Sequence, residues 1–175
     1  MHSDLLMILQ WRTNPDITKF MNTDIEFDID KQYQWYEEKV SIHSPALHWV
    51  IVHNNRPVGF LNLENYDKEN QTTSWSYYIG ELESRIIGSL IPAYFYNYMF
   101  FKRDIELEKI YGQLFKDNLK VLKMHQLYGV KEVELLKDHI YKYGKSFDII
   151  SIEMSRKNWL SQKEKFQNYH SVFEE

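Results

Sequence analysis

The sequence predicts a single α+β domain of 175 residues, in which one mixed β-sheet is covered by helices. Three features of the sequence support this fold class. Apolar residues recur at helical spacing up to residue 42, and from residue 46 onward they follow the spacing of strands. A strand, a helix and a second strand succeed one another over residues 72–115, which indicates a parallel crossover. The stretch 130–154 has the pattern of a hairpin.

Helical segments open the chain. Residues 3–12 have an apolar face behind a candidate N-cap at Ser3, and a second short helix begins at Pro15, so the two predict a bent first helix. Residues 29–42 have aromatic and aliphatic side chains at helical spacing, with Asp28 available as the cap. This segment is expected to form the second helix.

Three strands of an antiparallel meander are expected next. Two of them lie within residues 46–66 and meet at Asn54-Asn55, a pair that tolerates the positive φ of a tight hairpin. The third strand is expected at residues 72–82, which continue the strand pattern. These three strands form one half of the predicted sheet.

The second half of the chain alternates helices with strands. An apolar, aromatic helix follows Gly88-Ser89 and has Pro92 near its first turn, where a missing amide proton costs least. Residues 107–115 are expected to form a strand and residues 116–129 a helix. The last hairpin is expected to turn at Tyr143-Gly144.

The composition limits the possible functions. With 21 Lys and Arg against 25 Asp and Glu, the net charge is -4, and no basic stripe favours nucleic acid or an anionic membrane as a partner. The absence of cysteine excludes a disulfide framework, a cysteine-ligated zinc and a thiol nucleophile, and no metal site is expected. The longest apolar runs are too short for a membrane span of about 20 residues. We expect a cytoplasmic protein with its core at about residues 5–159 and a polar tail at 160–175.

The stretch SRIIGSL, residues 84–90, is a candidate phosphate site. A glycine allows the backbone to approach a ligand closely, and the free amides at a helix start bind phosphate oxygens. Arg85 adds a positive charge beside Gly88. Neither a G-x-G-x-x-G nor a G-x-x-x-x-G-K-[ST] pattern occurs in the chain. The alternative is that this glycine only makes a turn.

The order of elements, the turn RIIGSL, Asn118 at the start of the next helix and Tyr128-Gly129-Val130 at its end resemble the GNAT acyltransferases. The resemblance covers roughly residues 5–159 and implies acetyl-CoA as co-substrate. It implies that the pyrophosphate is bound by Arg85, Ile86, Ile87, Gly88, Ser89 and Leu90. It implies that the pantetheine arm is bound by Tyr78, Ile79, Gly80 and Asn118.

Two features depart from the family pattern. Ser89-Leu90 stands where glycine or alanine is commoner, which binding through backbone amides tolerates. The family's first strand should precede the LLMILQWR helix, and this sequence begins too late to contain it. We therefore expect either a sheet that lacks this strand or a sequence that has lost its start.

His125 is the candidate general acid. Many GNAT enzymes carry a tyrosine seven residues after the asparagine, where it protonates the departing CoA thiolate, and His125 occupies that place here. A neutral imidazole can donate a hydrogen bond and an imidazolium can donate a proton. Tyr128 is the reserve acid. The structural alternative is that both side chains pack in the core.

The stretches WRTNPDITKFM and DHIYKYGKSFDIISIEMSRKNW resemble the N-acetyltransferases of the pseudaminic acid pathway. That resemblance implies a UDP-linked 4-amino sugar as acceptor, approached by Arg12, whose guanidinium suits a diphosphate. Glu64 and His48 are candidates for the base that deprotonates the amine, with His48 also expected to line the acceptor site. A surface ion pair for Arg12, a solvated Glu64 and a packed His48 are the structural alternatives.

Other acceptors remain open. An acetyltransferase of polyamines or of ribosomal-protein N-termini would share the general plan. A polyamine site needs carboxylates, and the stretch DIEFDID, residues 24–30, is the acidic cluster that could supply them. A non-enzymatic acyl-CoA-binding module is the third reading, and assembly as a homodimer is left open.

Overall fold

The computed structural model describes residues 2–40, 46–103 and 105–174. The strands are β1 (Leu47–His53), β2 (Arg56–Asp67), β3 (Thr72–Ile79), β4 (Lys109–Phe115), β5 (Lys131–Lys142) and β6 (Lys145–Ser155). The helices are α1 (His2–Thr13), α2 (Pro15–Thr18), α3 (Ile29–Lys39), the 3₁₀ helix η1 (Leu82–Ser89), α4 (Ile91–Phe101), α5 (Leu119–Leu127), α6 (Arg156–Leu160) and α7 (Lys163–Phe166).

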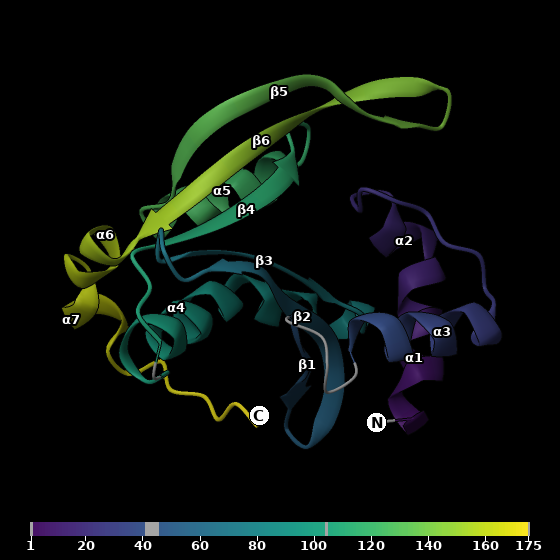
Figure 1. The fold of residues 1–175 in the computed structure, drawn as a ribbon, viewed down its shortest axis with the longest axis horizontal. Helices are drawn as coiled ribbons and strands as arrows, with labels where there is room; N and C mark the ends of the chain where they lie inside the picture. The colour runs from purple at the N-terminus through teal and green to yellow at the C-terminus, as the bar shows by residue number, and fades with distance from the viewer. Residues whose placement is uncertain (1, 41–45, 104, 175) are drawn as a thin grey trace.

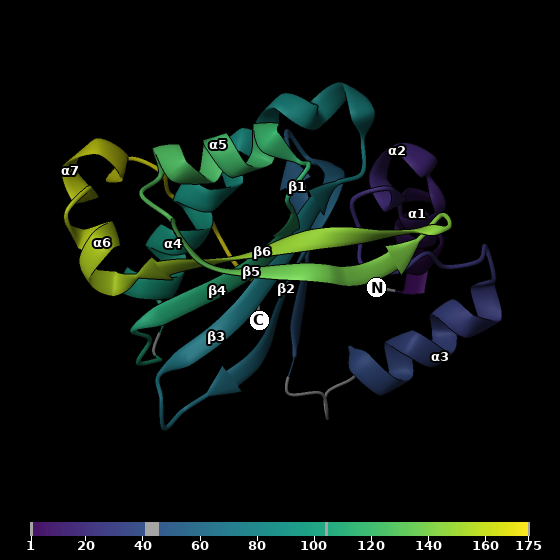
Figure 2. The same ribbon diagram turned by 90° about the horizontal axis from the view of Figure 1, so that it is seen from above.

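The six strands form one mixed sheet in the order β1-β2-β3-β4-β6-β5. Helices α1, α2 and α3 gather at one side of the molecule, and α6 and α7 lie at the other (Figure 1). Viewed from above, α4 and α5 lie together over one face of the sheet (Figure 2). The predicted α+β class, with a mixed sheet covered by helices, is confirmed.

Local capping fixes the helices that open the chain. Helix α1 begins at His2, so Ser3 lies inside its first turn rather than before it, and the predicted cap is wrong. The Asn14 side chain caps α2 just before Pro15, which produces the bend predicted in this region. Asp28 caps α3 by accepting two main-chain N–H groups, each at 3.0 Å. The expected end of that helix near residue 42 lies outside the described residues.

Strands β1, β2 and β3 form the predicted antiparallel meander. The turn between β1 and β2 is Asn54-Asn55, with φ of 50° and 59°, as expected for a tight hairpin with both residues at positive φ. Tyr143-Gly144 likewise turns β5 into β6, with φ of 52° and 75°. Both hairpin predictions are confirmed.

The connection from β3 to β4 is the predicted parallel crossover. The two strands pair over only three residues each, Thr72–Ser74 with Lys109–Tyr111, and then diverge. Between them the chain forms η1 and then α4, whose second residue is Pro92. The sequence predicts an open turn before α4, and the structure differs because residues 82–89 coil into a 3₁₀ helix.

The main core lies between the sheet and α4. Phe95 and Met99 of α4 and Met154 of β6 are fully buried, and Ile110 of β4 is 1% exposed. A smaller apolar cluster joins Ile8, Trp11 and Ile17 of the opening helices to the β2–β3 region. These two clusters hold the helices against the sheet.

Two aromatic side chains of the segment 160–175, which is predicted to be a polar tail, pack against the rest of the fold. Phe166 is buried and stacks on Trp159 with ring centroids 5.0 Å apart. Phe173 stacks on Tyr98 of α4 at 3.9 Å. Individual aromatic residues within a polar stretch pack against the core at this end of the molecule. The average composition of the stretch does not reveal them.

No strand precedes α1 among the described residues. Within the same residues, no helix combines the length and apolar character that crossing a membrane requires.

Candidate active site

A cleft with a volume of about 1330 Å³ lies among the described residues. It is lined by α1, by the segment 20–28, by α3 and by residues from all six strands. Four of the residues that the sequence singled out line it together: Arg12, His48, Glu64 and Tyr78. A site of this size accommodates a small-molecule ligand.

The divergence of β3 from β4 opens into this cleft. From Trp75 onward, no described strand pairs with the β4-facing edge of β3. Trp75, Tyr77, Gly112 and Gln113 line the cleft at this point. An unpaired strand edge presents main-chain donors and acceptors, which suit an extended, amide-containing ligand.

Aromatic rings form one wall of the cleft, which we call the aromatic wall: Trp35, His48, Phe60 and Tyr78. The Phe60 ring lies 5.7 Å from His48 and 5.9 Å from Tyr78. Trp35 contacts His48 edge-on at 5.6 Å. Successive same-face positions of neighbouring strands place these rings side by side, because side chains on one face of a sheet alternate along each strand.

Two buried polar atoms in the aromatic wall have no hydrogen-bond partner in the structure. They are Nδ1 of His48 and the hydroxyl of Tyr78. The other ring nitrogen of His48 lies 3.0 Å from the carbonyl of Lys39, and burial lowers the pKa of His48, which keeps the ring neutral. Burial raises the pKa of Tyr78, so its hydroxyl stays protonated. Both residues line the cleft, and each of these two buried atoms lacks a partner among the described residues.

The cleft carries an excess of negative charge. Its carboxylates are Asp24, Glu26, Asp28, Glu64 and Glu134, and its cationic side chains are Arg12 and Lys31. The Lys31 ammonium is already paired with Glu26 at 2.7 Å. The acidic stretch singled out in the sequence thus does contribute to the cleft, through its first three carboxylates.

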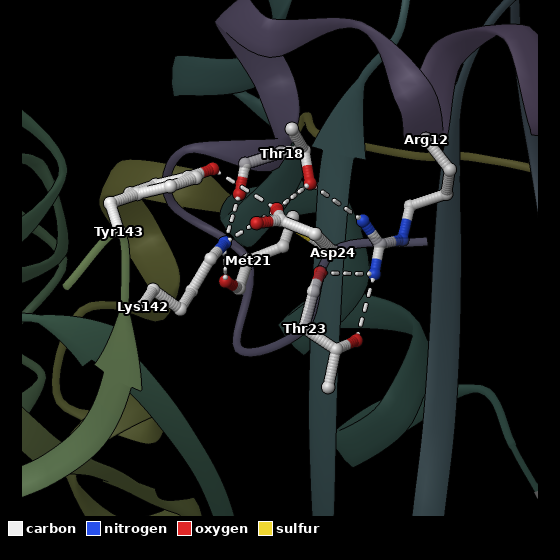
Figure 3. Close-up of polar contacts among 7 residues, drawn as sticks. All are labelled: Arg12, Thr18, Met21, Thr23, Asp24, Lys142 and Tyr143. Atoms are coloured by element: carbon white, nitrogen blue, oxygen red, sulfur yellow. Dashed lines mark hydrogen bonds and ion pairs between the residues drawn. The ribbon is translucent and has the colours of Figure 1, made fainter. Parts of the chain in front are cut away.

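Arg12 holds the segment that leads into the cleft. One guanidinium nitrogen donates to the hydroxyl of Thr18 at 3.4 Å, and the other donates to the carbonyl and hydroxyl of Thr23 at 3.0 and 3.2 Å (Figure 3). Burial lowers the pKa of Arg12 below its ordinary value, and the nearby Asp24 acts in the opposite direction. In this structure the guanidinium is therefore engaged by the protein itself.

The residues expected to bind pyrophosphate lie outside this cleft. Arg85–Ser89 belong to η1, and in a 3₁₀ helix each N–H donates to the carbonyl three residues earlier. Arg85 lies 3.6 Å from Asp16. A Cβ added to Gly88 would lie 3.1 Å from the Ile79 side chain, so glycine permits the close approach of η1 to β3. The expected free amides are thus used within the helix.

The residues expected to bind pantetheine lie in different environments. Tyr78 and Ile79 lie on the open edge of β3. The N–H of Gly80 instead donates to the carbonyl of Val58 at 2.8 Å, and the ring of Trp11 covers its Cα. Asn118 takes the N-cap position of α5, as expected, without a side-chain capping bond.

The two acid candidates lie on the α5 side of the sheet. His125 is 5% exposed and faces the Trp75 ring edge-on at 6.2 Å. Burial lowers the pKa of His125 to about 4, and its Nδ1 has no partner. The buried Tyr128 donates its hydroxyl to the carbonyl of Ser89 at 2.6 Å. Neither side chain lines the cleft. Trp75 does line it, and the same ring also contacts His125.

No group of three potential metal ligands occurs in the part of the chain that the structure describes. The open edge of β3 and the close approach of η1 fit a CoA thioester better than a metal. A CoA arm supplies amides that can pair with a strand edge.

A parallel crossover whose strands diverge beside an acidic cleft defines the class of protein as an acyltransferase of the GNAT type. The family model described as Acetyltransferase (GNAT) domain matches residues 1–131. The chain belongs to this family and is an acetyl-CoA-dependent N-acetyltransferase.

Solved structures share the fold. The spermidine N-acetyltransferase from Vibrio cholerae in complex with CoA and spermine superposes with a TM-score of 0.79 at 16% identity, covering 90% of this chain and 93% of that chain. A mutant of the same Vibrio cholerae enzyme superposes with a TM-score of 0.78 at 16% identity, covering 93% and 96%. No curated protein gives a sequence match.

Two features in and beside the cleft are not predicted from the sequence. The aromatic wall could have been found from alternation, since His48, Phe60 and Tyr78 each lie at strand positions facing the same side. Lys142 donates to the carbonyl of Thr18, which is 124 residues earlier in the sequence and lies beside the cleft. No local sequence pattern predicts this contact.

Proposed function

We propose that this enzyme transfers the acetyl group of acetyl-CoA to a primary amine of a small cationic acceptor, of the polyamine type. The observation that carries this is the combination of carboxylates and aromatic rings in one cleft beside the divergent strands. Carboxylates attract ammonium groups, and aromatic faces attract cations through their quadrupoles.

The acetyl-CoA arm is proposed to lie along the open edge of β3. Tyr78 and Ile79 would offer main-chain groups to its amides, and Asn118 would offer a side-chain amide. The pyrophosphate would bind near Arg85 and Gly88. Since the amides of η1 are engaged in the present structure, binding there requires this short helix to rearrange.

The reaction forms a bond between the acceptor nitrogen and the acetyl carbon and breaks the bond from that carbon to sulfur. The amine must be neutral to attack, so its proton passes to a base. His48 is neutral and has an unpartnered Nδ1 in the cleft, which supports this role for it. Glu64, in the same cleft, is the second candidate.

The departing thiolate takes a proton or a hydrogen bond from the α5 side. Because His125 titrates at about pH 4, it is neutral at pH 7 and can contribute an N–H but not an imidazolium proton. Tyr128 carries its phenolic proton, and that proton is directed at Ser89 in the present structure. We assign the role to His125 as a hydrogen-bond donor, with Tyr128 as the reserve.

A UDP-linked amino sugar is the acceptor implied by the sequence resemblance. Its diphosphate would need cationic partners. Both cationic side chains that line the cleft are already engaged, Arg12 by Thr18 and Thr23 and Lys31 by Glu26. The charge of the cleft therefore supports the cationic acceptor, and the fold shared with spermidine N-acetyltransferases agrees with it.

The test is an acetylation assay with three acceptors: spermidine, a UDP-linked 4-amino sugar and a short peptide with a free N-terminus. We expect CoA release with spermidine and a mono-acetylated product by mass spectrometry. Turnover with the UDP-sugar and with neither of the other two compounds would show that the acceptor is the nucleotide sugar and not a polyamine. Binding of acetyl-CoA without turnover of any acceptor would favour the non-enzymatic reading.

A further inference from the structure

The tip of the β5–β6 hairpin reaches across the molecule to the segment that leads into the cleft. In Figure 1 the hairpin extends toward α2, and Figure 2 shows its tip beside the same helix. Lys142, the last residue of β5, makes this contact with a side chain that is only 5% exposed. Lysine is seldom buried unless its charge has partners.

The ammonium of Lys142 has a complete set of partners. Its Nζ lies 2.9 Å from the carbonyl of Thr18, 2.8 Å from the carbonyl of Met21 and 2.8 Å from Oδ1 of Asp24 (Figure 3). An ammonium has three N–H donors, and each has an acceptor here. All three acceptors belong to residues 18–24, so one side chain fixes the course of the whole segment.

Asp24 is the centre of this contact. Its Oδ1 also accepts the hydroxyl of Thr18 at 2.7 Å and the hydroxyl of Tyr143 at 3.0 Å. The hydrogen bond from Lys142, followed by that from Thr18, holds the pKa of Asp24 below its usual range. Asp24 is therefore charged and committed to the hairpin tip, although its side chain still borders the cleft.

The segment is held from its other side by Arg12, which donates to Thr18 and Thr23. Met21, Thr23 and Asp24 line the cleft, whereas Lys142 does not. A change at Lys142 can therefore reach a bound acceptor only through the segment that it holds.

We propose that Lys142 is a positioning residue that fixes the segment 18–28, and with it the acidic side of the cleft, for the amine acceptor. This inference rests on the proposed function, since it needs an acceptor that binds in the cleft. Lys142 touches neither substrate. A lysine is required because arginine presents a planar fork that does not match three acceptors arranged around one nitrogen.

The experiment compares Lys142→Met with the matched control Lys145→Met. Lys145 pairs with Lys142 across the hairpin, is exposed, and has its ammonium over the Phe147 ring. For Lys142→Met we expect an acceptor KM about tenfold higher, with the KM for acetyl-CoA and kcat changed less than about twofold. Amide hydrogen exchange of residues 18–28 should be faster in the same variant. Lys145→Met should match the wild type in each measurement.

Two further variants keep the test decisive if Lys142→Met folds poorly. Tyr143→Phe removes one hydrogen bond to Asp24, and we expect a smaller rise in acceptor KM in the same direction. Asp24→Asn combined with Lys142→Met should raise the acceptor KM by less than the two single changes predict together, because both changes disrupt the Lys142–Asp24 ion pair.

The outcomes separate the two proposals. A wild-type enzyme that acetylates no amine contradicts the proposed function. An active wild type whose acceptor KM stays constant in Lys142→Met and Tyr143→Phe contradicts the positioning role. Equal increases in both KM values would also overturn it, because they would show a distortion that is not confined to the acceptor side of the cleft.

Discussion

His125 lies edge-on to Trp75, with ring centroids 6.2 Å apart and an interplanar angle of 88°. Trp75 lines the cleft and His125 does not, so the histidine reaches the cleft only past this ring. The histidine therefore packs as a buried residue behind the Trp75 ring, and its contact with the departing thiolate stays a prediction.

The first prediction concerns stability at low pH. Because burial lowers the pKa of His125 from 6.5 to about 4, the unfolded chain binds a proton in that range and the folded protein does not. Stability should therefore fall as the pH drops from about 6.5 to 4, by up to about 3 kcal/mol at about 1.4 kcal/mol per pKa unit. Urea unfolding at pH 7 and pH 4.5 measures this. In His125→Phe this part of the pH dependence of stability should be absent. A pH dependence identical to that of the wild type would refute the assignment.

The second prediction concerns the departing thiolate. If the N–H of His125 stabilises it, His125→Ala should lower kcat about 10²-fold with little change in the KM for acetyl-CoA. His125→Tyr should recover part of the rate, since tyrosine is the commoner family residue. The rate must be expressed per folded molecule, because the alanine also leaves a cavity. Normal turnover in His125→Ala together with loss in Tyr128→Phe would transfer the role to Tyr128.

The third prediction concerns Gly88. A Cβ at this position would lie 3.1 Å from the Ile79 side chain, and the larger side chain of valine cannot be placed without moving η1 from β3. We expect Gly88→Val to weaken acetyl-CoA binding at least tenfold, on the order of 1.4 kcal/mol. Calorimetric titration measures the affinity. Unchanged affinity in Gly88→Val would show that this region does not bind the co-substrate.

The fourth prediction concerns the end of the chain. Phe166 is buried against Trp159 and Tyr128, with ring centroids 5.0 Å from each. Phe166→Ala should destabilise the fold by about 3–5 kcal/mol, the usual cost of removing a buried aromatic ring. Thermal or urea unfolding measures the change. A loss below about 1 kcal/mol would restore the description of this stretch as a peripheral tail.

The elements that the sequence predicts well are those set by neighbouring residues. Asp28 caps α3 through bonds to N–H groups two and three residues away, and Asn54-Asn55 adopts the positive φ that its own turn needs. The parallel crossover also follows from the order of elements. In each case the physical cause lies within a few residues of the position predicted.

The features that the sequence does not predict depend on distant partners. Arg12 is expected to face a nucleotide because a guanidinium suits a diphosphate, yet it donates to Thr18 and Thr23. The segment that contains these two residues is held in part by Lys142. The 3₁₀ helix at residues 82–89 packs against Ile79, which lies on a preceding strand. Such contacts leave no periodic signal in the sequence.

The most direct test of the account is the effect of removing negative charge from the cleft. Glu64→Gln combined with Glu134→Gln, which removes two carboxylates that line the cleft, should raise the KM for spermidine about tenfold or more, while the KM for acetyl-CoA stays within about twofold. Glu69→Gln, in the exposed turn between β2 and β3, is the matched control and should behave as the wild type. An unchanged KM for spermidine in the double variant would contradict recognition of a cationic acceptor by this cleft.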